Sequence, residues 1–372
     1  MRFSTVSHIL CGAVAVSAAT IPRSASLKRD SETVDLSQFG NGFQTLSPED
    51  AKAAADDTFD PSLVTKPDQV TSATNAVDGE PAAAAADTCT NPTVRVEWRD
   101  MADSDKTAFL KAVNCLLKAP SAGNFPGSQN RYEDIVVVHQ QMTGSIHMVQ
   151  QFLPWHRYYL NIYESILRDE CSYAGPMPWW DETKDAGSFA NSPLFTDQWF
   201  GRAPLKTADG QGTCITSGAF AGLTLHIGPG SGNSDHCLSR AVDESATQYC
   251  SSDFVAQCAT NSNYTNYEKC NELGPHAYGH NGLGAVMSEV SASPGDPAFF
   301  MHHSFVDHMW RMWQTADSED RLYQINGDST TTDPKQPLTL AYKLSSMGLR
   351  PDVTVQDVMD TTGGYLCYRY SY

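Results

Sequence analysis

Apolar residues recur at helical spacing in several stretches of the chain, and these stretches predict a mainly α protein. In residues 107–117, five apolar side chains line one side of a helix. The segment FFMHHSFVDHMWRMW, which begins at Phe299, is amphipathic in the same way. Pro154 is tolerated only near a helix start, so a further helix is predicted from there through Leu167. A short helix is predicted over residues 354–359.

Glycine and proline interrupt this pattern and predict the loops between the helices. They gather in residues 120–130 and 175–235, and Pro294 to Pro297 reads PGDP. Gly144 predicts a break before His147, and Gly282 and Gly284 are natural ends for the helix before them. The expected fold is a central four-helix bundle that carries inward-facing side chains, surrounded by long loops and a few short strands.

The N-terminal quarter of the chain differs in pattern from the rest. Residues 1–19 combine Arg2, a short apolar run and small residues, which is typical of a secretory signal peptide. Residues 20–87 are rich in Ala, Ser, Thr and Asp and show little apolar periodicity, so we expect a flexible propeptide or linker. One amphipathic turn is possible near residues 48–55. Residues 88–372 are long enough to bury a large core and form the predicted catalytic domain.

Charge and cysteine content indicate a secreted, extracellular protein. The net charge of −18 makes the chain a poor binder of nucleic acid or anionic membranes, and no segment after the signal peptide has 18 consecutive apolar residues. Ten cysteines, one of them in the signal peptide, suggest up to four disulfides and one leftover thiol. Asn263-Tyr264-Thr265 is a glycosylation sequon. The sequence predicts no particular oligomeric state.

More than half of the 11 histidines fall into two blocks of three. The blocks are His139, His147 and His156, and His276, His280 and His303. Imidazole suits copper, zinc, iron and nickel. Two such sets without cysteine or carboxylate predict a paired-metal centre that handles a small ligand.

Other interpretations of these residues fit the sequence less well. A single HxxxH pair is more often structural than metal-binding, and here Ala277 stands where a zinc protease needs glutamate. A two-metal hydrolase should also show carboxylate ligands, which both sets lack. Asp181 and Glu182 could be imagined as catalytic carboxylates, but packing beside the bundle is the commoner role for such a PWWD segment.

Three motifs resemble the copper A and copper B signatures of tyrosinases and catechol oxidases, most closely those of short secreted fungal members. They are FLPWHRYYLNIYESILRDEC, PHAYGHNGLG and DPAFFMHHSFVD. The resemblance covers roughly residues 89–372. It implies a type 3 site in which two copper ions bind dioxygen, the first block holding copper A and the second block holding copper B. His302 then packs beside the ligand His303.

The same resemblance implies roles for residues around the metals. Glu272 corresponds to a carboxylate that positions a water near copper B, and Val290 to a gate over copper A. Asp307 is a candidate partner for a ligand histidine. Tyr368 and Tyr370 match a YxY signature, for which Arg99 is the expected partner. The expected disulfides are Cys115–Cys171 and Cys89–Cys367.

Departures from the family pattern refine the expected activity. Ser145 replaces a cysteine that forms a thioether in some relatives, so that crosslink is not expected. Ala277 replaces an asparagine common in proficient monophenol hydroxylases, which weakens help in deprotonating a phenol. His308 follows Asp307 where Arg or Lys is common. Because the chain stops at Tyr372, a C-terminal lid domain is not expected.

We therefore expect an oxidase of o-diphenols, with o-aminophenols as further candidate substrates, dioxygen as the second substrate and two copper ions as cofactors. The alternatives left open are a tyrosinase with substantial monophenol hydroxylase activity and a dioxygen carrier without turnover.

Overall fold

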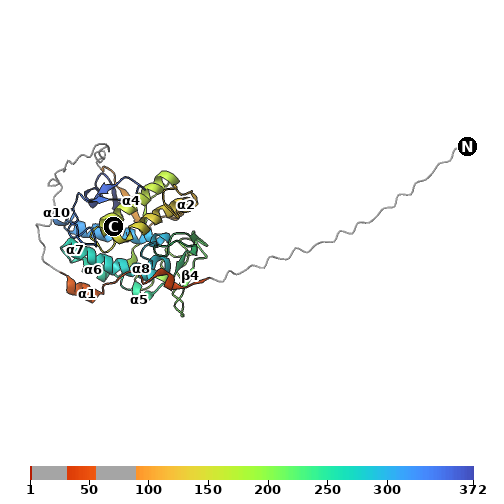
Figure 1. The fold of residues 1–372 in the computed structure, drawn as a ribbon, viewed down its shortest axis with the longest axis horizontal. Coiled ribbons are helices and arrows are strands. Elements are labelled where there is room, and N and C mark those ends of the chain that lie inside the picture. Colours follow the sequence, from red (N-terminus) through yellow and green to blue (C-terminus); the bar gives the residue numbers. More distant parts are fainter. Residues whose placement is uncertain (2–31, 56–88) are drawn as a thin grey trace. The chain divides into compact units, whose positions relative to one another are not determined.

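The computed structural model describes Met1, residues 32–55 and residues 89–372 (Figure 1). The predicted signal peptide lies outside the described residues, as does most of the predicted propeptide. In the part that is described, no helix is both long and apolar enough to cross a membrane.

Long helices form the centre of the fold. They are α2 (Asp103–Lys118), α3 (Arg131–Ile146), α4 (Phe152–Cys171) and α9 (Ala298–Ala316). The shorter α8 (Ala277–Leu283) follows a π-helical turn, η6 (Glu272–His276). Helix α4 packs against α2, α3 and α9, while η6 contacts both α8 and α9. The protein is therefore mainly helical, with α3, α4, α8 and α9 as the central bundle, as predicted.

Smaller helices surround this bundle. They are α1 (Pro48–Ala54), α5 (Glu244–Thr247), α6 (Ser252–Ala259), α7 (Tyr264–Asn271), α10 (Ser318–Arg321) and α11 (Val355–Met359). Short 3-10 turns are η1 (Leu36–Phe39), η4 (Glu182–Lys184), η5 (Phe189–Asn191), η7 (Ala285–Ser288) and η8 (Ser293–Gly295). The helices predicted over residues 107–117 and 354–359 are confirmed as parts of α2 and α11.

The strands are short and form small sheets at the margins. One sheet has the order β1 (Thr33–Val34), β4 (Gly212–Cys214) and β7 (Ser239–Arg240), all antiparallel. A second has the order β10 (Tyr368–Tyr370), β2 (Thr93–Glu97) and β3 (Pro178–Trp179), all parallel. Two further pairs are β5 (Thr224–Leu225) with β6 (His236–Cys237), and β8 (Lys343–Leu344) with β9 (Val353–Thr354).

The helix boundaries follow from local chemistry. The Asn130 side chain accepts the Glu133 N–H and begins α3. The predicted break at Gly144 is wrong, because α3 continues to Ile146 and the chain turns only at Met148, whose φ is 59°. A glycine inside a helix costs about 1 kcal/mol relative to alanine, and helix packing offsets that cost here. Gly284, with φ 72°, ends α8 as predicted.

Residues 32–55 differ from the flexible segment that their composition predicted. Strand β1 pairs with β4, Phe39 is buried, and α1 packs on α6, which Figure 1 shows beside it. The possible turn near residues 48–55 is confirmed as α1. Contacts with distant parts of the chain offset the ordering entropy of this segment, and local composition does not report them.

Four disulfides join the described cysteines. The two expected ones, Cys89–Cys367 and Cys115–Cys171, are confirmed. Cys214–Cys237 and Cys258–Cys270 complete the set, and Cys250 is buried without a disulfide partner among the described residues.

A buried charge network links the last strand to the bundle and corrects two predictions. Asp307 accepts from Arg157, Arg95 and both tyrosines of β10 rather than from a ligand histidine. The arginine that lies over the Tyr368 ring, 3.5 Å from its centroid, is Arg95, not Arg99. In the parallel register Tyr370 pairs with Arg95, whereas Arg99 lies beyond the end of β2 and binds acidic groups there.

Candidate dinuclear metal centre

The first histidine set comes from α3, its end and α4. His139 lies on α3, His147 directly follows it, and His156 is in the first turns of α4. All three are buried, and each offers a nitrogen within 4.8 Å of those of the other two. The structure therefore brings the predicted copper A residues together.

The second set comes from η6, α8 and α9. His276, His280 and His303 are buried and lie within the same 4.8 Å limit, together with His302. The predicted copper B residues are thus brought together as well, with one additional imidazole beside them.

The two sets face each other across one compartment. His156 and His303 stack with ring centroids 4.5 Å apart, and His147 and His276 are 6.4 Å apart. Phe299 packs on His303 at 4.0 Å and closes one side with an apolar wall.

Backbone carbonyls fix the orientation of five of the six rings. Each Nδ1–H donates to one carbonyl: His139 to Ser291 at 2.7 Å, His147 to Thr143 at 3.2 Å, His156 to Phe152 at 2.8 Å, His276 to Glu272 at 2.8 Å and His280 to Met287 at 2.7 Å. A carbonyl can only accept, so Nδ1 carries the proton and Nε2 is left with a free lone pair. Such ring orientation is typical of metal-ligating histidine.

The remaining ring nitrogens are those expected of metal ligands. In the described structure, Nε2 of His139, His147, His156 and His276 is buried without a hydrogen-bond partner. Nε2 of His280 and Nε2 of His303 lie 3.2 Å apart. That spacing fits two nitrogens bound to one ion at about 2.0 Å. Buried lone pairs without partners are costly, and metal ions would satisfy them. The residues therefore fit a pair of copper ions.

Burial keeps these imidazoles neutral, the form that binds metal. Desolvation lowers the pKa of His147 to about 4. It also lowers the pKa of His139, His156, His276 and His280 well below the ordinary value, with further lowering by neighbouring imidazoles. Little protonation therefore competes with metal at neutral pH.

Glu272 is buried and is hydrogen-bonded to residues at or next to one ligand of each set. Its Oε1 accepts the Met148 N–H at 2.8 Å, one residue after His147, and its own carbonyl orients His276. Burial raises the pKa of Glu272, and hydrogen bonds from Met148 and Glu268 oppose that rise. Burial and the charge of Glu272 raise the pKa of Glu268 even further. Burial and mutual repulsion therefore both disfavour the charged forms of these two carboxyl groups.

Sequence reasoning did not identify Glu268. It precedes Glu272 by four residues along α7 and η6, so helical spacing could have indicated that the two carboxyl groups meet.

The two other predicted site residues, Ala277 and Val290, each adjoin in sequence a residue that is a metal ligand or orients one. Ala277 is buried at the start of α8, directly after His276, and presents only a methyl group. Val290 is half-buried and precedes Ser291, whose carbonyl orients His139. Val290 thus adjoins a residue that orients a copper A ligand, and its gating role stays a prediction.

His302 lies beside the copper B set and meets a buried carboxylate. Its Nδ1 lies 2.6 Å from Oε1 of buried Glu182. An added Cβ at Gly279 would lie 2.5 Å from the His302 ring, so only glycine lets this pair approach α8 so closely. Glu182 thus orients His302 and takes no place among the metal ligands, in agreement with its predicted packing role.

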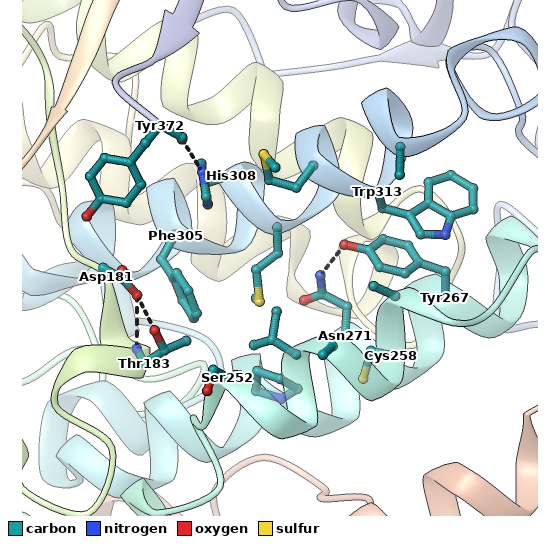
Figure 2. A pocket seen from close by; sticks show the side chains of 17 residues that line it. Asp181, Thr183, Ser252, Cys258, Tyr267, Asn271, Phe305, His308, Trp313 and Tyr372 are labelled. Atoms are coloured by element: carbon teal, nitrogen blue, oxygen red, sulfur yellow. Dashed lines mark hydrogen bonds between the residues drawn. The ribbon is translucent and has the colours of Figure 1, made fainter.

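A cavity of about 370 Å³ is lined by residues of α6, α7 and α9 (Figure 2). Figure 2 shows Phe305, His308 and Trp313 of α9 and Tyr267 and Asn271 of α7 around it, and the Trp313 and Tyr267 rings stack 4.6 Å apart. None of the six predicted ligands lines it. Its lining is mostly apolar, and it holds no group placed to bind a metal pair.

The bundle and its two imidazole sets define a protein with a candidate dinuclear metal site. Residues 129–316 match the model of the common central domain of tyrosinase, and this chain belongs to the tyrosinase family. Members of this family use a dinuclear copper site on phenolic substrates with dioxygen.

Fungal relatives and a solved structure agree with this assignment. Tyrosinase P of Aspergillus terreus is 30% identical over 336 residues, covering 76% of this chain and 93% of its own. N-acetyl-6-hydroxytryptophan oxidase ivoB of Emericella nidulans is 30% identical over 338 residues, covering 75% and 92%. A polyphenol oxidase from Thermothelomyces thermophila is similar in structure, with a TM-score of 0.66 and 28% identity over 76% of this chain and 89% of that chain.

Proposed function

We propose that this protein is a secreted oxidase that converts o-diphenols, and o-aminophenols, to the corresponding o-quinones and o-quinone imines. Two molecules of catechol and one of dioxygen give two o-quinones and two waters. The observation that carries this choice is Ala277, a buried methyl side chain directly after the first predicted copper B ligand. Without an amide at that position, a water near Glu272 loses an orienting hydrogen bond.

The residues of this chain have separable tasks in such a reaction. When bound, the copper ions supply the two-electron chemistry between dioxygen and the phenol. The histidine nitrogens hold them, Phe299 and neighbouring side chains exclude water, and Glu272 accepts a proton from the incoming hydroxyl. A catechol ring can pack against the face of the His280 imidazole, as the Phe43 ring does in this structure.

Two other functions have one observation each in their favour. The buried carboxyl of Glu272 supports monophenol hydroxylation, because a base near neutral pKa can deprotonate a phenol. The Phe43 ring, which stacks on His280, supports a dioxygen carrier, because a carrier must keep phenols from its metals. The relatives named above carry different activities in their names, so family membership alone does not choose among these functions.

Paired substrates test the proposal most directly. Steady-state oxidation rates should be compared for 4-methylcatechol and 4-methylphenol, with 2-aminophenol as a third substrate. We expect kcat/KM to be higher for the catechol than for the matched phenol. A higher value for 4-methylphenol would contradict the proposal, and reversible dioxygen binding without oxidation of any of the three would indicate a carrier. Secretion is tested by the presence of the protein, without its first residues, in culture medium.

A further inference from the structure

The N-terminal segment places an aromatic side chain on the predicted metal ligands. The Phe43 ring stacks on His280, with centroids 4.1 Å apart and planes inclined by 22°. The same ring meets His276 edge-on at 5.2 Å and His147 at 5.9 Å. Phe43 therefore lies against histidines of both sets, at the face on which the proposed function places a phenolic ring.

The backbone of Phe43 is fixed as firmly as its ring. The Phe43 N–H donates to Oδ1 of Asn281 at 2.9 Å, and Nδ2 of Asn281 donates to the Phe43 carbonyl at 2.8 Å. Asn281 directly follows His280 on α8. Gly42 has a φ of 73°, and an added Cβ there would lie 2.5 Å from Oδ1 of Asn281. Only glycine at position 42 allows this approach.

Contacts on both sides of Phe43 hold the rest of the segment. Before it, β1 pairs with β4 and the Phe39 side chain is only 4% exposed. After it, the Leu46 N–H donates to the Leu273 carbonyl at 2.7 Å, and α1 buries Ala51 against α6. Phe43 thus belongs to a docked segment with anchors at both ends.

We propose that residues 32–55 form an autoinhibitory plug in which Phe43 occupies the place of the substrate's aromatic ring. This inference rests on the proposed function, because it assigns a regulatory state to the same site. The Phe43 ring of the plug and the aromatic ring of a phenol compete for the same face of the His280 imidazole. If the plug leaves the site open in about a tenth of the molecules, the apparent affinity for a phenol falls about tenfold.

Three variants of the full-length, copper-loaded protein test the plug. Phe43→Ala removes the ring, and Gly42→Val displaces it by colliding with Asn281. Gln38→Ala, an exposed position of the same segment, is the matched control. The readouts are copper content, the affinity for benzoate, a ring-bearing carboxylate that is not oxidised, and kcat/KM for 4-methylcatechol. We expect about tenfold tighter benzoate binding and about tenfold higher kcat/KM in the first two variants, with copper content unchanged.

The outcomes separate the plug from the proposed function. Equal benzoate affinity in the parent and all three variants would overturn the plug, whether or not catechol is oxidised. Tighter benzoate binding in Phe43→Ala and Gly42→Val without catechol oxidation would support the plug and contradict the oxidase.

Discussion

A single methyl group at Ala277 carries the substrate preference proposed for this protein. Ala277→Asn would supply an amide beside Glu272, able to orient a water that takes the phenol's proton. We expect monophenol hydroxylation to rise relative to o-diphenol oxidation, by roughly tenfold, since complete general-base assistance contributes about 10²–10⁴-fold. The measurement is the ratio of kcat/KM values for 4-methylphenol and 4-methylcatechol.

Glu272→Gln is the companion change, because it keeps the shape of the side chain and removes the base. It should lower monophenol activity further and leave copper content intact. An unchanged activity ratio in Ala277→Asn, with copper still bound, would show that selectivity comes from the pocket walls instead. Val290 would then be the next residue to test.

For single residues, the sequence predicts which histidines lie together but not which groups orient their rings. Motif spacing identified all six predicted ligands, and the structure brings them together. The carbonyls that orient them, such as those of Ser291 and Met287, belong to irregular turns whose course depends on tertiary packing. Asp307 was misjudged for a related reason: helical spacing placed it one turn after His303, but its side chain points to the network of arginines and tyrosines.

Among the elements, α4 and α9 are joined by that network. Asp307 on α9 accepts from Arg157 on α4 and Arg95 on β2, all three nearly inaccessible to solvent. Removing one partner of a buried ion pair leaves the other charges uncompensated. Asp307→Asn should therefore lower the free energy of unfolding by about 3–5 kcal/mol, measured by urea denaturation. Asp197→Asn, in an exposed pair with Arg202, is the control and should change stability little.

The Asp307 carboxylate also predicts that the free energy of unfolding depends on pH in the acid range. Burial alone would raise the pKa of Asp307, but Arg157 and Arg95 outweigh burial and the net pKa is lowered. A group with a lowered pKa in the folded state stabilises the fold above its unfolded pKa, and that stability is lost as pH falls through the folded pKa. The difference in stability between the parent and Asp307→Asn should therefore shrink below about pH 4. A difference independent of pH down to acid unfolding would contradict this assignment.

Long helices with strong apolar periodicity were predictable, and most of the short elements were not. Helices α2, α9 and α11 follow from spacing alone. The docked segment over residues 32–55 does not, because its stability comes from β4, α6 and α8, which lie far away in sequence. A local pattern cannot report such contacts.

For the whole molecule, composition and cysteine count anticipated one large disulfide-bonded domain. The Cys89–Cys367 bond closes residues 89–372 near their two ends, and β2 pairs with β10 beside it. Within this closed domain the two helix pairs place their histidines in one compartment. The fold thus serves mainly to hold two sets of neutral imidazoles face to face.

Copper stoichiometry tests that central claim most directly. The purified protein and its His280→Ala variant should be analysed for copper and zinc after expression with ample copper, with His236→Ala, a histidine outside both sets, as the control. The account predicts two copper ions per chain in the parent and the control, and about one in His280→Ala with the fold retained by circular dichroism. Stoichiometric zinc without copper in the parent, or two copper ions still bound in His280→Ala, would contradict it.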